Sequence, residues 1–459
     1  MRALAGLLII VFGLTYTAVV RANGRFPQAQ QIASVPGDPS TVYLRATFGI
    51  LQSKDGGKTW HWICEKALGY EGQWDPSIAV TRDGRLWVGL ETGVTSSADG
   101  CKFERSPELE GETVKDITTD GKSETVYVAT GQPGRKGYVW RHKPGAAAFE
   151  KLATLEDVNI MTIDVAPGTS QRVYLSGQPY STIRGQIYRS DDGGLTFKTD
   201  KGDGGASSSG LKADGPLFIG AIDRNDPDRL LARHLHAHGS DLLLSKDGGK
   251  TFENVLAIKS AMFGFAWSDD GKTYWAASGL KEDGIFRSDD RGAHFERVSN
   301  EGVLCLHSAP NTLFICGNPF TYGQTTIERS DDRGVTVTPI AKFEDIQGPL
   351  ACTNICAEAW PTTKQALVSP PVESASASDL PPDAGRKKRR KRDAGAEDGG
   401  TEPVAPSSKC GCETVGAPTN DALAGAFAFG VAALARKVRR RRSSVRQASG
   451  ADHGSSTSG

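Results

Sequence analysis

Short segments in which apolar and polar residues alternate recur along most of the chain, and glycine, aspartate and proline interrupt them every few residues. Alternation with a period of two is typical of strands, whereas a helix places its apolar residues three and four positions apart. One stretch predicts strands at residues 160–165, 172–175, 186–189 and 196–198. The next stretch repeats this order at residues 216–222, 229–235, 241–244 and 251–255. The pattern predicts an all-β protein built from four-stranded units.

Each unit contains a short turn rich in acid and glycine, called the repeat turn below. Its clearest copy is the segment SKDGGKTW at residues 53–60, and similar segments begin at Ser190, Ser245, Ser288 and Ser330. Two weaker copies lie at Ser97, which starts a shorter turn, and around Pro144, where the acid is missing. The key positions are 42 to 55 residues apart. Seven units of such even length indicate the blades of a β-propeller.

The repeat turn resembles the Asp-box, also called the BNR repeat, over residues 31–343. In that family the turn joins the third and fourth strands of each blade. The resemblance implies a seven-bladed β-propeller of four-stranded antiparallel blades over residues 23–360. A short carboxylate can accept the backbone N–H groups of such a turn, and glycine adopts positive φ without a Cβ clash. We therefore expect structural roles for the box acids, which are Asp55, Asp99, Asp192, Asp247, Asp290 and Asp332.

Composition and charge agree with a β-rich extracellular body. The chain has 54 glycines and 23 prolines but only 3 methionines, which suits short strands and tight turns. Its formal net charge of zero combines an acidic body at residues 23–360 with a basic tail at residues 361–459. The acidic body argues against nucleic-acid binding. Nothing in the sequence predicts a cofactor.

The N-terminus has the features of a secretory signal peptide. Arg2 precedes an apolar run at residues 3–20, and small residues flank a predicted cleavage site between Ala22 and Asn23. An uncleaved membrane anchor is the alternative. We expect residues 1–22 to be removed and the protein to be exported, which would permit disulfides.

Six cysteines lie in the body, and six cysteines can pair in 15 ways. From proximity in the repeat order we expect Cys305 and Cys316 to pair with Cys352 and Cys356, which leaves Cys64 for Cys101. No strand is exchanged between the termini in the predicted repeats, so these bridges would close the ring.

The tail predicts a linker followed by a sorting signal. Residues 361–409 are rich in proline, alanine and charge and predict a disordered linker, whose basic run at 386–392 we interpret as solvated. Cys410 and Cys412 then precede an apolar stretch at 422–435 and a basic cluster at 436–442.

This arrangement at residues 410–442 resembles the MYXO-CTERM sorting signal of myxobacterial surface proteins. The resemblance implies cleavage near Cys410, a modified cysteine and display at the cell surface through the envelope membrane. The disordered tail at residues 443–459 departs from that pattern, and a permanent weak anchor is the alternative.

Loops from second to third strands and loops between blades form the face that carries function in Asp-box propellers. Gly-Gln-Pro or Gly-Asn-Pro recurs there at residues 131–133, 177–179 and 317–319, which a turn preference could also explain. Aromatic and amide side chains suit sugar rings or peptides, although loop aromatics can equally be packing residues. The candidate ligand-binding residues are Tyr70, Trp74, Gln132, Gln178, Tyr180, Arg184, Asn318, Phe320 and Tyr322.

Three histidines form a candidate metal site. A period of two places His234, His236 and His238 on one face of an extended strand, at the end of the second strand of blade five. Imidazole suits zinc, copper or nickel, but neighbouring positions are about 7 Å apart, which is wide for one tetrahedral ion. Ordinary polar packing is the alternative.

No catalytic residue can be assigned. Sialidases share Asp-boxes, but they have six blades and three substrate-binding arginines, and residues 25–27 imitate their Arg-Ile-Pro motif poorly. Xyloglucanase-like hydrolases pair two such propellers, whereas this chain has one. Candidate acids are too numerous to choose among, and they include Asp75, Glu91, Asp241, Glu282 and Asp283.

The favoured hypothesis is therefore a monomeric, exported, non-catalytic propeller that binds an extracellular polysaccharide or protein. In architecture it resembles sortilin-type and photosystem-assembly propellers, which bind polypeptides. A secreted glycoside hydrolase and a structural spacer are the alternatives.

Overall fold

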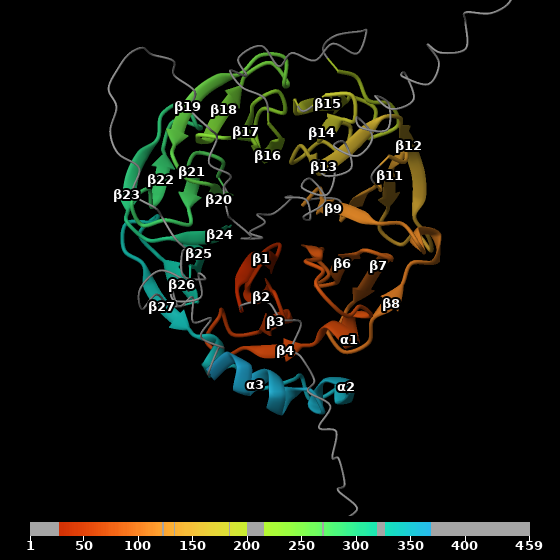
Figure 1. Cartoon of the computed structure of the whole chain (residues 1–459), viewed down its shortest axis with the longest axis vertical. Coiled ribbons are helices and arrows are strands. Elements are labelled where there is room, and N and C mark those ends of the chain that lie inside the picture. The colour runs from red at the N-terminus through yellow and green to blue at the C-terminus, as the bar shows by residue number, and fades with distance from the viewer. Residues whose placement is uncertain are drawn as a thin grey trace, which may run out of the picture.

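Seven twisted sheets surround a central axis and form a ring (Figure 1). The computed structural model describes residues 27–121, 124–132, 134–182, 184–199, 215–268, 270–318 and 326–368. Each sheet is an antiparallel meander whose first strand lies nearest the axis. The predicted seven-bladed β-propeller is confirmed.

Blades one to three follow one another along the chain. Their strands are β1 (Ala29–Val35), β2 (Asp38–Ala46), β3 (Gly49–Ser53), β4 (His61–Ile63), β5 (Ser77–Val80), β6 (Leu86–Leu90), β7 (Gly93–Ser97), β8 (Glu104–Arg105), β9 (Val114–Thr119), β10 (Val126–Thr130), β11 (Gly137–His142) and β12 (Glu150–Leu155). Two short helices lie between these blades, α1 (Glu65–Leu68) and the 3-10 turn η1 (Pro107–Leu109).

Blades four to seven complete the ring. Their strands are β13 (Val158–Val165), β14 (Val173–Pro179), β15 (Gln186–Ser190), β16 (Leu217–Ile222), β17 (Leu230–His236), β18 (Gly239–Ser245), β19 (Glu253–Ile258), β20 (Met262–Trp267), β21 (Tyr274–Ser278), β22 (Ile285–Ser288), β23 (Glu296–Ser299), β24 (Val303–Ala309), β25 (Thr312–Gly317), β26 (Ile327–Ser330) and β27 (Thr338–Ala341). In the residues that the structure describes, blade four has three strands, and its predicted fourth strand contributes one antiparallel bridge, between Arg189 and Lys198.

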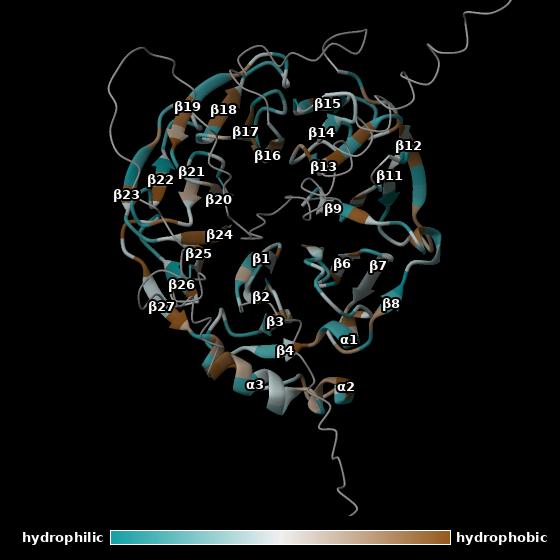
Figure 2. Cartoon of the chain, in the orientation of Figure 1, coloured by the Kyte–Doolittle hydropathy of each residue, from teal (hydrophilic) through white to brown (hydrophobic). Residues whose placement is uncertain are grey.

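The hydrophobic core lies between neighbouring blades rather than in one central mass. Tyr127 and Val139 of blade three pack with Ile163 and Val173 of blade four, and all four side chains are fully buried. Figure 2 shows hydrophobic residues on inner strands such as β13 and β24. Burying such a side chain contributes about 1.5 to 3 kcal/mol, so packing between the blades holds the ring together.

The repeat turn is stabilised by its own acid. In blade one, Asp55 Oδ1 accepts the Thr59 N–H at 2.9 Å, and Asp55 Oδ2 accepts the Thr59 hydroxyl at 2.7 Å. Ser53 donates its hydroxyl to Asp55 at 2.8 Å and accepts the Gly57 N–H at 2.9 Å. Gly57 has a φ of 89°, a conformation that glycine adopts without strain.

In four other blades the box acid likewise accepts the backbone N–H four residues on, at Asp192, Asp247, Asp290 and Asp332. In the shorter turn of blade two, Asp99 accepts the N–H groups of Cys101 and Lys102 instead. Desolvation opposes ionisation of Asp192, but hydrogen bonds from Thr196 and Ser190 outweigh it and lower the pKa of Asp192 to about 2. These carboxylates therefore accept hydrogen bonds from their own turns, which is a structural role. Blade three lacks the acid, and there Arg141 instead pairs with Glu150 at 2.7 Å.

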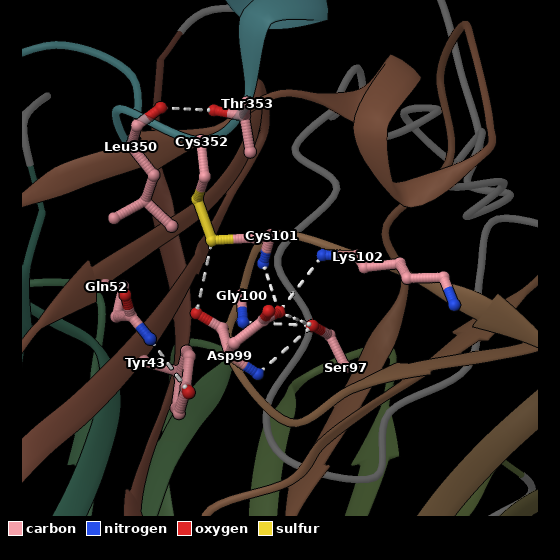
Figure 3. The surroundings of a disulfide bond; sticks show 10 residues. All are labelled: Tyr43, Gln52, Ser97, Asp99, Gly100, Cys101, Lys102, Leu350, Cys352 and Thr353. Atoms are coloured by element: carbon pink, nitrogen blue, oxygen red, sulfur yellow. Dashed lines mark hydrogen bonds between the residues drawn. A yellow bond between two sulfur atoms is a disulfide. The ribbon is translucent and has the colours of Figure 1, made fainter.

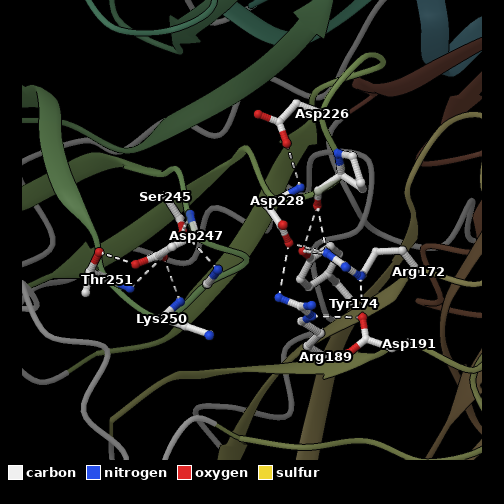
Figure 4. A network of polar contacts seen from close by, with 12 residues as sticks. Arg172, Tyr174, Arg189, Asp191, Asp226, Asp228, Ser245, Asp247, Lys250 and Thr251 are labelled. Atoms are coloured by element: carbon white, nitrogen blue, oxygen red, sulfur yellow. Dashed lines mark hydrogen bonds and ion pairs between the residues drawn. The ribbon is translucent and has the colours of Figure 1, made fainter.

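Arginines join neighbouring blades on the side of the ring that carries the repeat turns (Figure 4). Arg172 and Arg189 of blade four both reach Asp228 of blade five, the second at 3.1 Å. The same two arginines share Asp191 at 2.7 and 3.0 Å. Since Tyr174 also donates to the Pro227 carbonyl at 2.7 Å, this network fixes the junction between blades four and five.

The C-terminal end of the described chain closes the ring. Residues 343–368, called the terminal strap below, contain η2 (Phe343–Asp345), α2 (Asn354–Ala357) and α3 (Trp360–Val368). The strap returns from blade seven to the outer edge of blade one (Figure 1), where Trp62 forms a parallel bridge with Pro349. Trp62 donates to the Gly348 carbonyl at 2.7 Å and accepts the Leu350 N–H at 3.2 Å. The strap therefore covers a strand edge that would otherwise be exposed.

All six body cysteines form disulfides, but the predicted pairing is wrong. The bonds join Cys64 to Cys356, Cys101 to Cys352 and Cys305 to Cys316. Cys305 and Cys316 lie opposite each other on β24 and β25, with their Cα atoms 4.9 Å apart, so they bond within blade seven.

The other two disulfides follow the path of the terminal strap. Cys101 lies in the repeat turn of blade two, where Cys352 of the strap reaches it (Figure 3). Cys64 follows β4 and bonds to Cys356 in α2. Within the described residues, no strand is exchanged between the first and last blades, as predicted. Disulfides also help to close the ring, but they attach the strap to blades one and two rather than to blade seven.

Helix α3 extends past the boundary expected at residue 360, so residues 361–368 of the predicted linker are helical. The signal peptide at 1–22, the remainder of the linker and the segments 410–442 and 443–459, including Cys410 and Cys412, lie outside the described residues. Within the described part of the chain, no helix is long and apolar enough to cross a membrane.

Candidate ligand-binding surfaces

The antiparallel order of the strands gives the ring two different faces. Repeat turns and the turns between first and second strands lie on one face. Loops between second and third strands, and the connections between blades, lie on the other, which we call the loop face. Hydrogen bonds within the repeat turns already engage their acids. The loop face and the wall of the ring are therefore the surfaces on which a ligand-binding site is expected.

On the loop face, several predicted ligand residues hold neighbouring loops together. Tyr180 of blade four donates its hydroxyl to the Gln132 carbonyl of blade three at 2.9 Å. Asn318 of blade seven donates its side-chain amide to the Gly279 carbonyl of blade six at 2.6 Å. The recurring Gly-Gln and Gly-Asn positions therefore include contacts between blades, which fix the loops.

The other predicted ligand residues are dispersed. Tyr70 and Trp74 are half-buried against the core between blades one and two, and Trp74 donates to the Gly89 carbonyl at 3.1 Å. Gln178 lies in β14 opposite Asn159, and Arg184 forms a parallel bridge with Gly215. Phe320 and Tyr322 lie outside the described residues. The structure thus joins Gln132 to Tyr180 and does not gather an aromatic groove from the described members of the set.

Two of the predicted metal ligands come together with an acid. His234 and His236 on β17 and Asp241 on β18 have candidate ligand atoms that all lie within 4.8 Å of one another. His238 does not join them, because it belongs to the two-residue turn between β17 and β18 and its side chain is exposed. The sequence pattern alone did not indicate that the strand ends at His236, so His238 was expected on the same face.

Among the candidate acids, two are engaged on the loop face. Asp241 lies 3.5 Å from His236 Nε2, and Asp283 accepts the Ser260 hydroxyl. Asp75 is buried, while Glu91 and Glu282 are held on loops of blades two and six. These positions and contacts do not indicate a shared catalytic or binding role for the five acids.

The inner strands contain two titratable groups that are not among the site residues predicted from the sequence. Burial raises the pKa of Asp164 on β13 to about 7, and Asp164 Oδ2 accepts no hydrogen bond from the described residues. Burial, with a smaller effect of Arg224, lowers the pKa of His307 on β24 to about 4. The signal available in the sequence for both was an acid or imidazole side chain within a mostly apolar inner strand.

An open groove lies between the outer parts of blades three and four, with a volume of about 490 Å³. Its apolar walls come from Leu152 and Leu155 on β12, from Tyr188 on β15, and from Leu195 and Phe197 in the repeat turn of blade four. Leu195 is 52% exposed, one of few large apolar side chains in the described residues that face solvent to this extent.

The edge of β15 beside this groove is partly unpaired. Arg189 exchanges both backbone hydrogen bonds with Lys198, at 2.9 and 2.8 Å, and Gly185 donates to Gly215 at 2.9 Å. Alternation along a strand then turns the N–H and C=O of Ile187 to the same edge, and no described residue pairs with them. An apolar groove beside unpaired backbone groups can receive an extended polypeptide.

The fold and this groove define a seven-bladed β-propeller with an open apolar groove on its wall. No family model and no curated protein matches the chain. Among solved structures, the chain is similar to the GH74 xyloglucanase from Xanthomonas campestris, with 16% identity over 67% of this chain and 63% of that chain and a TM-score of 0.36. YCF48 from Cyanidioschyzon merolae gives 17% identity over 63% and 92%, with a TM-score of 0.42.

An ancestral GH74 enzyme is 14% identical over 67% of this chain and 44% of that chain, with a TM-score of 0.47. The chain therefore spans 63% and 44% of the two GH74 enzymes.

Proposed function

We propose that the protein is an exported, surface-displayed, non-catalytic propeller of the Asp-box type that binds an extracellular polypeptide. The observation that carries this proposal is the groove between blades three and four, where the exposed side chain of Leu195 lies beside backbone groups of β15 that no residue in the described part of the chain pairs. An apolar side chain of the ligand would enter the groove, and its backbone would meet Ile187. The predicted signal peptide and sorting signal, together with the three disulfides, support export.

A polypeptide fits the described surface better than a polysaccharide does. Sugar rings are commonly bound against exposed aromatic faces. Every aromatic side chain among the described residues is buried or half-buried, and Tyr180 already donates its hydroxyl to the loop of blade three. The groove instead combines leucine side chains, the partly covered rings of Tyr188 and Phe197, and a strand edge, and an apolar pocket beside a strand edge is what extended peptides use.

A matched pair of variants tests the site. Leu195→Asp places a charge in the groove, and Val335→Asp changes the corresponding position of the blade-seven repeat turn, where the side chain is 53% exposed. Peptides selected from a displayed random library on the exported protein should bind Leu195→Asp at least about tenfold more weakly, since one buried apolar side chain contributes about 1.5 to 3 kcal/mol. Val335→Asp should bind them like the wild type.

Three results would contradict the proposal. Release of reducing sugar from cell-wall polysaccharides would indicate a hydrolase, and retention on a glycan array without turnover would indicate a polysaccharide-binding protein. A loss of thermal stability in Leu195→Asp that Val335→Asp does not share would mean that the groove is part of the folded chain's own packing.

A further inference from the structure

A cluster of two imidazoles and one carboxylate lies on the β17–β18 hairpin of blade five. His234 and Asp241 are directly opposite each other across the two strands, and His236 lies two residues further along β17 on the same face. His236 Nε2 is 3.5 Å from Asp241 Oδ2, and the His234 and His236 rings are 5.5 Å apart between centroids. The hairpin therefore brings together three donor groups from positions that backbone pairing fixes.

The cluster is sheltered but reachable. His234 is buried, whereas the side chains of His236 and Asp241 are 15% and 17% exposed. Gly215 packs directly over it, since a Cβ at that position would lie 3.2 Å from His234 Nε2 and 1.9 Å from the Leu235 carbonyl oxygen. One wall of the cluster is thus closed by backbone, and His236 and Asp241 leave the other side accessible.

We propose that His234, His236 and Asp241 bind one zinc ion, with a coordination position left open. Zinc accepts imidazole nitrogen and carboxylate oxygen at about 2.0 to 2.2 Å, which places ligands of a tetrahedral ion about 3.4 Å apart. The His236–Asp241 separation already meets this distance, and the full spread of 4.8 Å closes by about 1.4 Å through side-chain rotation. This site does not depend on the proposed polypeptide groove in blades three and four.

Two His ligands and one carboxylate suit zinc for chemical reasons. Zinc has no d-electron preference for a geometry, so it tolerates a ligand set fixed by strand pairing. Three protein ligands are typical of zinc sites that hold water or a ligand atom in a fourth position. On the loop face that position would be available to a carboxylate or imidazole from another molecule.

Zinc binding would change the turn that contains His238. The His238 N–H now donates to His236 Nδ1 at 3.2 Å, which requires that nitrogen to be unprotonated. Coordination through Nε2 moves the ring proton to Nδ1, so the bond from the His238 amide is lost. Hydrogen exchange at the His238 amide should therefore become faster when zinc binds.

The test titrates zinc chloride into the purified exported protein by calorimetry and records the visible absorption of the cobalt-substituted form. One ion should bind per chain, and His236→Ala and Asp241→Asn should each weaken binding at least about tenfold. Both side chains are partly exposed, so these variants should keep the wild-type circular dichroism. His238→Ala is the matched control, and it should bind zinc like the wild type.

The proposal is wrong if the wild type binds no zinc, or if His236→Ala and Asp241→Asn bind it as the wild type does. It is also wrong if His238→Ala weakens binding as much as His236→Ala, since three histidines would then form the site. Unchanged exchange at the His238 amide in saturating zinc would contradict coordination through Nε2.

Discussion

His307 Nε2, on the inner strand of blade seven, accepts the backbone N–H of Ser34 in blade one at 3.1 Å. The Ser34 hydroxyl lies 2.8 Å from the same nitrogen. The bond crosses the junction where the first and last blades meet. It requires a neutral imidazole, and burial lowers the pKa of His307 to about 4.

The first prediction concerns this junction in acid. Unfolded His307 takes up a proton near its ordinary pKa of 6.5, whereas the folded residue does so near 4. The stabilisation is therefore fully present above pH 6.5 and is lost as the pH falls to about 4, by up to about 3 kcal/mol. His307→Gln, which does not titrate, should remove this part of the pH dependence in urea unfolding between pH 7.5 and 4. His238→Gln, at an exposed position in the β17–β18 turn, serves as the control, and an unchanged slope in His307→Gln would contradict the assignment.

The second prediction has the opposite sign. The pKa of Asp164 is raised from 3.8 to about 7, so the unfolded chain loses this proton first and stability falls as the pH rises between these values. Asp164→Asn should be more stable than the wild type at pH 8, by up to about 4 kcal/mol, and similar to it near pH 4. Equal stability of the two proteins at pH 8 would show that Asp164 is not held in its neutral form. Because the windows of Asp164 and His307 overlap with opposite signs, only the single variants separate them.

The third prediction concerns the disulfides. Non-reducing peptide mapping should link Cys64 to Cys356, Cys101 to Cys352 and Cys305 to Cys316. Replacing Cys101 and Cys352 by serine should destabilise the chain more than replacing Cys305 and Cys316. With the bond from Cys64 to Cys356 intact, the Cys101–Cys352 bond closes a loop of about 41 residues, which is the sum of 37 from Cys64 to Cys101 and 4 from Cys352 to Cys356. The Cys305–Cys316 bond spans 11 residues, and loop-closure entropy gives about 4 and 3 kcal/mol for these two lengths. Equal losses in the two double variants would mean that native-state contacts, and not loop length, determine the effect.

The fourth prediction concerns the repeat turn. Asp192→Ala removes the acceptor of the Thr196 N–H and hydroxyl, and it should cost about 1 to 2 kcal/mol in chemical unfolding. Asp192→Asn keeps one acceptor oxygen and should cost less. If Asn and Ala were equally destabilising, the charge of Asp192, and not its geometry as an acceptor, would carry the effect.

Much of the fold could be predicted because its main determinants are local. An acid such as Asp55 bonds to residues within its own turn, so seven turns can be counted along the sequence without knowledge of tertiary contacts. The same holds for strands such as β17, which the repeated order of strands placed at residues 229–235.

The disulfides and the candidate sites depend on contacts between distant parts of the chain. Cys352 pairs with Cys101 because the terminal strap passes blades one and two, a path that no repeat encodes. The groove at Leu195 exists because blade four pairs its outer edge through one bridge at Lys198. Asp241 joins His234 only through the register of β17 with β18, which the sequence predicted in outline but not residue by residue.

The terminal strap determines how a mechanical load would enter the molecule. The chain continues beyond Val368, directly after α3, and two covalent bonds at Cys352 and Cys356 stand between that point and β27. Tension applied from the C-terminal side would reach blades one and two through sulfur before it could pull β27 away from its sheet. A tether attached there would therefore load the two disulfides first, and the backbone hydrogen bonds between β27 and β26 would not carry the force.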